Sequence, residues 1–260
     1  MKISQLYKYP IKSLTPLKSE SLVLNNNGYI DGDRLFGFRF QNAGERDNYE
    51  WQRKTSFAAL MHMPQIARLK ADFDEKSRTL IIKHNDQIVV NANVDLERTE
   101  IEQKFTDFVL ESDKELIKKF PERFPFMLVG GESHAHFHDG AQGGITLHSQ
   151  ESLDELNNQL GYKVEHVRFR SNIIIQGVSP WEEFDWIGQK VVINNLSFTV
   201  ERAVTRCLAI NCNPSDGTRD KNVLKSMLDF QDKKPPEFSV KLIPLDTEGQ
   251  ITVGDSIYIN

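Results

Sequence analysis

Apolar and polar residues alternate over many short stretches of this chain, which is the period-two pattern of half-buried β-strands. The stretch 190–203 shows it best, because an Asn-Asn turn joins its two arms and the second arm alternates Leu196, Phe198 and Val200. By the same criterion, strands are predicted over residues 3–9, 34–40, 66–73, 79–84, 87–92, 145–149, 167–177, 238–245 and 255–259.

A few stretches follow helical periodicity instead. Residues 97–110 and 221–230 carry apolar side chains at helical spacing, and a third helix is expected to begin after Ser149, whose hydroxyl would cap it. Strands outnumber helices, and few helices lie between consecutive strands, which argues against a doubly wound parallel sheet. We therefore predict a mainly β (α+β) fold with two antiparallel β-barrel-like domains and a few short helices.

The length and one proline-containing segment indicate how the chain divides. A chain of 260 residues is long enough for one large domain or two small ones. The segment 118–126 interrupts the strand pattern and contains prolines, so we interpret it as a linker. The predicted domains are residues 1–120 and 121–260.

The composition is that of a globular protein, with 39% hydrophobic and 27% charged residues. A net charge of −5 argues against general nucleic-acid binding, which needs a basic surface. We find no apolar run of the ~20 residues that span a membrane and no secretory signal at the start. With two cysteines, a disulfide framework, a four-cysteine zinc site and an iron–sulfur cluster are all unexpected. A cytoplasmic location is therefore expected.

Cys207 is the strongest candidate for chemistry. It follows a predicted strand, and Arg202 and Arg206 lie close before it. Guanidinium groups beside a thiol favour the thiolate, which binds soft metals and attacks electrophiles. The alternative is that Cys207 is a small buried apolar residue, as free cysteines often are.

Several basic and hydroxyl residues are candidates for binding an anion. In the predicted strand 167–177, alternation places Arg168, Arg170 and Asn172 on one face, which would suit a phosphate or another polar anion. Lys12-Ser13 follows the first predicted strand and could contact an anion as well. The alternative in both places is that these polar side chains simply face solvent and bind no anion.

Two further features have a functional and a structural interpretation. Ser149 opens a predicted helix, whose free N–H groups could bind a phosphate or could simply be capped by the serine. His134, His136 and His138 stand at every second position and would point one way in a strand, as zinc ligands can. Nearby glycines favour a polar loop instead.

A series of short motifs connects these candidates along nearly the whole chain. From the N-terminus they read ISQLYKYPIKSL, GDRLFGFRF, QRKTSFAAL, ITLHSQESLDELN, VRFRSNIIIQG, TRCLAINCNPSDG and ITVGDSIYI. In order and spacing they resemble the motifs of the MOSC-domain family, in particular the branch with an N-terminal MOSC-type β-barrel that includes the mitochondrial amidoxime-reducing component. There are two departures. Ser171 replaces the proline of the family's F-R-P-N strand, and residues 53–56 alter its R-Q-x-P segment.

The resemblance implies a molybdenum cofactor of the molybdopterin type, bound between the two parts of the chain. Cys207 matches the family's metal-ligating cysteine. The positions that match cofactor-binding motifs are Lys12, Ser13, Arg53, Ser149, Arg170, Asn172 and Arg206. Cys212 is expected to be structural or incidental.

The resemblance further implies an oxidoreductase that reduces N-hydroxylated small molecules, with electrons from a separate donor protein. Two alternatives stay open. The protein could carry sulfur as a persulfide on Cys207, or it could bind the cofactor without catalysis. No nucleic-acid or membrane partner is expected.

Overall fold

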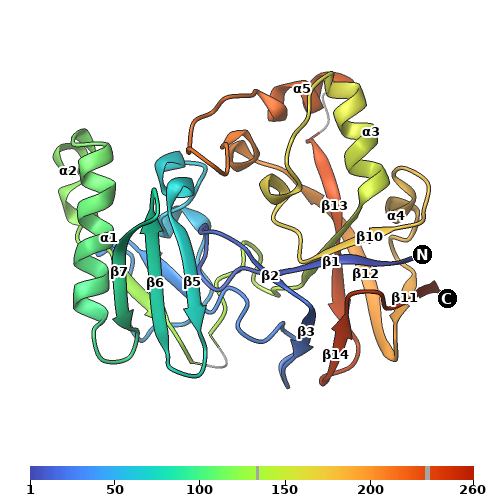
Figure 1. The fold of residues 1–260 in the computed structure, drawn as a ribbon, viewed down its shortest axis with the longest axis horizontal. Helices are drawn as coiled ribbons and strands as arrows, with labels where there is room; N and C mark the ends of the chain where they lie inside the picture. Colours follow the sequence, from blue (N-terminus) through green and yellow to red (C-terminus); the bar gives the residue numbers. More distant parts are fainter. Residues whose placement is uncertain (133–134, 232–234) are drawn as a thin grey trace.

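The computed structural model describes residues 1–132, 135–231 and 235–260. The chain forms two lobes that lie side by side (Figure 1). One lobe contains an eight-stranded sheet in the order β15-β11-β12-β13-β9-β10-β1-β2. Its strands are β1 (Lys2–Lys8), β2 (Leu17–Ser19), β9 (Ile145–Ser149), β10 (Ile173–Gln176), β11 (Lys190–Ile193), β12 (Leu196–Thr205), β13 (Glu237–Pro244) and β15 (Ile257–Ile259).

The same lobe carries a small two-stranded sheet and most of the short helices. The two-stranded sheet pairs β3 (Ser21–Leu24) with β14 (Gly249–Thr252). The helices are α3 (Gln150–Leu160), α4 (Glu182–Asp185) and α5 (Val223–Phe230), with the 3-10 turns η4 (His166–Phe169) and η5 (Leu208–Asn211). The Ser149 side chain accepts a hydrogen bond from Ser152 N–H, which confirms the predicted cap.

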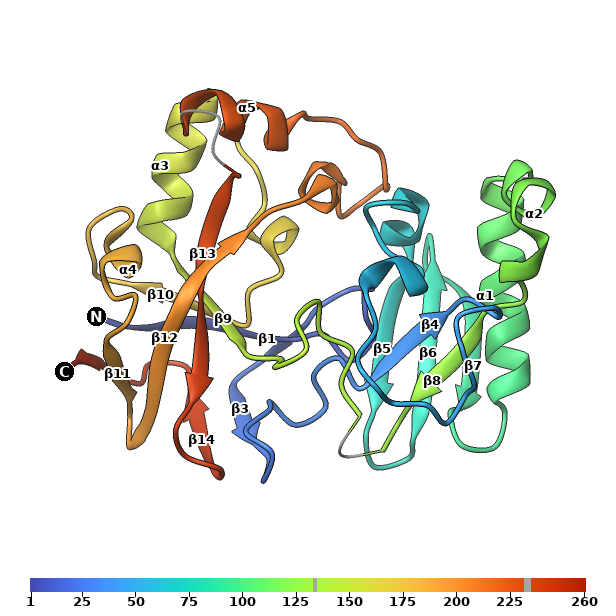
Figure 2. The ribbon, with the colours of Figure 1, turned by 180° about the vertical axis from the view of Figure 1, so that it is seen from behind.

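The other lobe is built from two small antiparallel sheets and one long helix. Figure 2 shows β4 and β8 beside the three-stranded sheet, with the helices at the outer end of the lobe. Its elements are β4 (Phe36–Arg39), β5 (Lys70–Asp74), β6 (Thr79–His84), β7 (Gln87–Asn93), β8 (Met127–Gly130), α1 (Arg98–Ser112) and α2 (Glu115–Lys119), with η1 (Lys54–Ser56), η2 (Pro64–Arg68) and η3 (Pro121–Arg123). Among the described residues, no helix combines the length and apolar character needed to cross a bilayer.

The mainly β class is confirmed, but the barrel prediction needs correction. The eight-stranded sheet does not close by continuous strand pairing within the described residues, although an isolated bridge joins Lys2 to Ser256. Nor is the sheet wholly antiparallel, since β9 and β10 pair in parallel. The physical reason is the connection: α3 lies between these two strands, and a helical crossover returns the chain in the same direction.

Two of the predicted strands are partly replaced by 3-10 turns. Of the predicted strand 167–177, only Ile173–Gln176 is extended, because η4 and a left-handed Arg170 precede it. The start of the predicted strand 66–73 is likewise the end of η2. The predicted linker 118–126 includes the end of α2 and all of η3.

Strand pairing crosses the division predicted at residues 120 and 121. β1 pairs with β10, and β3 pairs with β14, so the first strands of the chain belong to the lobe with the eight-stranded sheet, which we call the C-terminal lobe. The lobe with β4 to β8 is called the N-terminal lobe. Ile3, Leu6 and Leu22 accordingly pack in the core of the C-terminal lobe. The segment that follows β1 then crosses to the other lobe, where Lys12 N–H donates to Phe36 O over 2.8 Å. This crossing brings residues from both ends of the chain to the space between the lobes.

One buried group in the sheet makes a testable stability prediction. His148 on β9 is fully buried against Phe238, and both ring nitrogens lack a hydrogen-bond partner among the described residues. Burial lowers the pKa of His148 well below its ordinary value, and nearby His166 and Arg206 act in the same direction. The imidazole is therefore neutral in the fold, whereas the unfolded chain takes up a proton below about pH 6.5.

The substitution His148→Leu is expected to stabilise the protein. Removing an unsatisfied buried polar group should add about 1 kcal/mol or more to the free energy of unfolding at pH 7. The gain should grow by about 1.4 kcal/mol per pH unit as the pH falls below 6.5, because protonation of the unfolded histidine no longer favours unfolding. Urea unfolding at pH 7 and pH 5 measures both effects. A variant less stable than the wild type at both pH values would contradict this account.

Candidate functional site

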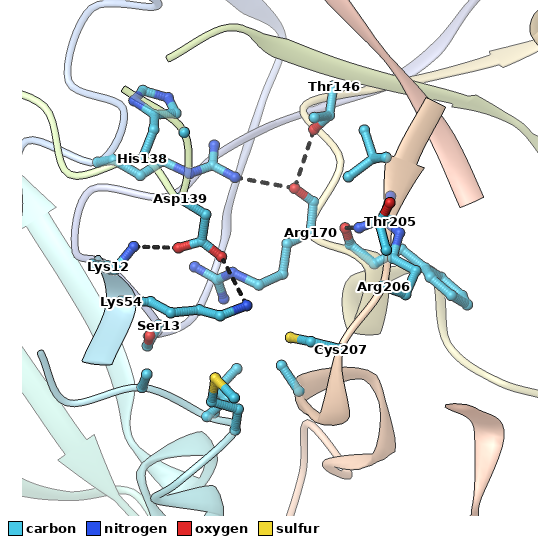
Figure 3. A pocket seen from close by; sticks show the side chains of 18 of the residues that line it. Lys12, Ser13, Lys54, His138, Asp139, Thr146, Arg170, Thr205, Arg206 and Cys207 are labelled. Atoms are coloured by element: carbon cyan, nitrogen blue, oxygen red, sulfur yellow. Dashed lines mark hydrogen bonds and ion pairs between the residues drawn. The ribbon is translucent and has the colours of Figure 1, made fainter. Parts of the chain in front are cut away.

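A cavity of about 270 Å³ lies between the two lobes and receives side chains from both. The N-terminal lobe contributes Lys12, Ser13 and Lys54, and the C-terminal lobe contributes Arg170, Arg206 and Cys207. Figure 3 shows these side chains gathered around one space, with the Cys207 sulfur directed into it. The cavity therefore joins five of the sequence-predicted site residues: Lys12, Ser13, Arg170, Arg206 and Cys207.

Lys12 is held in place by contacts to the segment after β8. Its Nζ donates to Phe137 O over 2.9 Å and forms an ion pair with Asp139. Burial lowers the pKa of Lys12, and the Asp139 carboxylate opposes that shift. Lys54 Nζ approaches the same carboxylate at 4.0 Å. Asp139 therefore sits between two ammonium groups on the cavity wall.

Arg170 owes its position to an unusual backbone conformation. It has a φ of 54°, in the left-handed region, at the end of η4. Such strain in a residue other than glycine persists only where surrounding contacts fix it. Here the guanidinium lies 4.3 Å from the Tyr9 ring centroid, and its Nη1 donates to Leu14 O over 2.8 Å. Burial lowers the pKa of Arg170 to about 10, which marks a cation with little compensation.

Arg206 is held by main-chain carbonyl groups. Its Nε donates to Phe238 O over 2.7 Å, and its Nη1 donates to Phe169 O over 2.8 Å. Burial lowers the pKa of Arg206 to about 9. In the described part of the chain, neither Arg206 nor Arg170 has a carboxylate partner in an ion pair. An anion in the cavity would offset the cost of keeping both groups charged.

Cys207 stands where β12 ends and η5 begins. β12 ends at Thr205, and Cys207 has an extended backbone as the residue before the 3-10 turn. Its thiol is free and its side chain is half-buried. Arg206, the preceding residue, also lines the cavity, so the sulfur lies beside a half-buried cation. A free thiol in this position is accessible from the cavity, and sulfur is a donor that suits a soft metal.

The cavity wall is strongly cationic although the whole chain has a net charge of −5. Asp139 is the one carboxylate among the described lining residues. The basic lining side chains are Lys12, Arg34, Lys54, Arg168, Arg170, Arg202, Arg206 and Lys241. Within the described chain, all of these except Arg170 and Arg206 have a carboxylate within 4.0 Å. Arg170 and Arg206 therefore leave positive charge that attracts anions, phosphates above all.

Three of the predicted binding residues do not line the cavity. Ser149 is fully buried, and its hydroxyl bonds to Ser152 and Glu183 instead. The Asn172 amide donates to Tyr7 O and Asp33, so it joins strands inside the fold. Arg53 is exposed outside the cavity, and its neighbour Lys54 lines the wall in its place. Alternation misplaced Asn172, because the backbone turns at Arg170.

The structure also places residues in the cavity that sequence reasoning missed. Asp139, Thr146 and Lys241 are examples. Asp139 follows the histidine series and precedes a glycine, a loop pattern without a specific signal. Of that series, His134 lies outside the described residues, and His138 lines the cavity with Nε2 3.4 Å from Asp33 Oδ2. Among the described residues there is no cluster of metal-ligating side chains that would support zinc.

Known proteins resemble this chain in both halves. Mitochondrial amidoxime-reducing component 1 of Mus musculus is 30% identical over 120 residues, which are 43% of this chain and 35% of that protein. Molybdenum cofactor sulfurase of Caenorhabditis briggsae is 24% identical over 249 residues, which are 92% of this chain and 33% of that protein. The matched regions thus span about a third of these relatives.

A solved structure and two family models complete the comparison. The YUAD protein from Bacillus subtilis aligns over 99% of this chain and 94% of its own, with 11% identity and a TM-score of 0.42. The model of the MOSC N-terminal beta barrel domain matches residues 1–119, and the model of the MOSC domain matches residues 134–258. The chain therefore belongs to the MOSC-domain family, with a MOSC N-terminal beta barrel domain preceding the MOSC domain.

Proposed function

We propose that the protein binds a molybdenum cofactor of the molybdopterin type in the cavity between the lobes and reduces N-hydroxylated small molecules. The observation that carries this proposal is a single free thiol, Cys207, directed into a cavity with a largely cationic wall. A thiol beside half-buried cations suits a metal that already has sulfur ligands and belongs to a group with a phosphate.

The residues present fit such a group. Cys207 would ligate the metal, and Arg170 and Arg206, which have no carboxylate partner among the residues that the structure describes, would meet the phosphate with their guanidinium groups. Lys12 and Ser13 would contact it from the N-terminal lobe. Of the remaining predicted positions, Arg53 is replaced by Lys54 in the proposed site, and Ser149 and Asn172 support the surrounding backbone.

The bound cofactor supplies the redox chemistry, as metal centres do in such enzymes. The chain itself holds the metal through Cys207, orients the group between two lobes and keeps its charge neutralised. The two cysteines of these 260 residues do not suffice for an iron–sulfur cluster. We therefore propose that the electrons come from a separate donor protein.

Turnover of benzamidoxime tests the reductase proposal. The protein would be produced in a cofactor-competent host fed with molybdate, and product formation would be measured with chemically reduced viologen as the electron source. We expect benzamidine to form in proportion to bound molybdenum. Protein that holds molybdenum but forms no product from benzamidoxime or other N-hydroxylated compounds would refute it.

A sulfur-carrier role is the second candidate function. The match to a molybdenum cofactor sulfurase over 92% of the chain favours it, and the half-buried Cys207 thiol is placed to carry a persulfide. Intact mass spectrometry separates the two candidates. The carrier role predicts an extra sulfur on Cys207 that a reductant removes, in protein without molybdenum. The reductase role predicts an unmodified Cys207 in protein with molybdenum.

A further inference from the structure

The cavity has an apolar part as well as a cationic one. Figure 3 shows Arg170, Arg206 and Asp139 on one side of the Cys207 sulfur. The remaining lining includes small and medium apolar side chains from both lobes. This apolar wall consists of Ala59, Leu60, Met61, Val204, Ala209 and Ile210.

The apolar wall lies next to Cys207 because of the chain's connectivity. Ala209 and Ile210 belong to η5, which begins directly after Cys207. Leu60 and Met61 come from the other lobe and are half-buried, so part of their apolar surface faces the cavity. If the cofactor's phosphate binds to the basic side of the cavity, this apolar surface stays free for a different ligand.

The segment that carries Leu60 and Met61 is fixed from the opposite lobe. Cys212 Sγ donates to Leu60 O over 3.2 Å, and Arg219 Nη2 donates to Met61 O over 2.7 Å. Gly217 packs so closely that an added Cβ would come within 2.5 Å of Pro64 O. These contacts hold the backbone of the segment, and a preorganised wall loses less entropy when a ligand binds.

We propose that the apolar wall binds the body of the substrate, and that Leu60 and Met61 are specificity-determining residues. The inference rests on the proposed function for the identity of the reacting group. It adds a substrate class: N-hydroxylated compounds whose N-hydroxyl group is attached to an uncharged apolar or aromatic body. A charged body would lose its hydration against Leu60 and Met61 without gaining a partner there.

Binding of benzamidoxime, measured by titration calorimetry, tests the inference independently of turnover. The cofactor-loaded wild type would be compared with Met61→Gln, with Met61→Leu, which keeps an apolar side chain of similar volume, and with Leu245→Gln. Leu245 is 56% exposed and does not line the cavity, so it is the matched control for a polar substitution. Thermal melting would confirm that each variant is folded.

We expect Met61→Gln to weaken benzamidoxime binding about tenfold, since a change in one apolar contact of a pocket has effects of that size. Met61→Leu and Leu245→Gln should bind within about twofold of the wild type. A benzamidoxime that carries a 4-trimethylammonium group should bind the wild type at least about tenfold more weakly than benzamidoxime, because the apolar wall offers this cation no partner and the basic side of the cavity repels it.

Equal affinity of the wild type and Met61→Gln, or no binding by the loaded wild type, would overturn the inference. The outcome for the proposed reaction is separate. Binding that depends on Met61 without formation of benzamidine would support the wall and refute the reductase proposal. Formation of benzamidine, together with an unchanged dissociation constant in Met61→Gln, would support the reductase proposal and refute the role of the apolar wall.

Discussion

Replacing Cys207 with alanine is expected to abolish benzamidoxime reduction by the molybdenum-loaded protein. The substitution removes the one cavity-facing thiol of the chain and with it the proposed protein ligand of the metal. Loss of groups that merely orient a metal ligand reduces activity or metal affinity 10- to 100-fold, roughly, so loss of the ligand itself should exceed about 100-fold. Product formation per bound molybdenum is the quantity to measure.

Cys212→Ala is the matched control for this substitution. The Cys212 thiol is buried and donates to the Leu60 carbonyl, which is a weak hydrogen bond. The variant should keep its maximal rate, with any change confined to the KM for substrate. If Cys207→Ala kept full activity, or if both cysteine variants lost activity equally, the proposed role of Cys207 would be wrong.

Arg170→Gln is expected to produce the second largest effect, on cofactor retention. Arg170 is half-buried, stacked on Tyr9 and without a carboxylate partner in the described chain, so its charge is available to an anion. Removing one partner of a buried charge-assisted contact costs about 2–5 kcal/mol, which corresponds to about 30-fold or more in affinity. The molybdenum content of the purified protein should fall accordingly.

Arg202→Gln makes the same change of charge at the edge of the same cavity. The Arg202 side chain is 53% exposed and lies 3.4 Å from the Glu201 carboxylate, so water and an acid already compensate it. Its loss should lower cofactor retention only a few-fold, in keeping with the small effects of exposed charges. Equal losses in the two variants would show that the cavity attracts the cofactor by net charge alone. Pyrophosphate binding to cofactor-free protein offers a second readout of the same contrast.

The sequence predicted those turns and helix ends that are stabilised by contacts between residues a few positions apart. The turn between β11 and β12 was predicted from its Asn-Asn sequence, and Asn194 in this turn has a left-handed backbone conformation. The cap at Ser149 and the helix that follows it were also readable, because a capping hydroxyl acts within three residues of itself. The position of Cys207 just after a strand could also be predicted, because β12 ends close to the point where the alternation of apolar and polar residues ends.

The shape of the site depended on long-range contacts that no local pattern reveals. Arg170 faces the cavity because of a left-handed backbone, and strict alternation predicted an extended strand there. Asn172 consequently points into the fold, where it bonds to Tyr7 and Asp33. The pairing of β1 with β10 spans most of the chain, and that pairing carries Lys12 to the cavity. Of the eight residues predicted from the motifs, five line the cavity, whereas Arg53, Ser149 and Asn172 do not.

The central claim is that this chain holds molybdenum through Cys207, and metal analysis of the purified protein tests it most directly. Wild type and Cys207→Ala would be produced in a cofactor-competent host fed with molybdate, and their molybdenum content would be measured per chain. We predict about one molybdenum atom per wild-type chain and a large loss in the variant. Wild-type protein without molybdenum, or an equal content in both proteins, would contradict the claim.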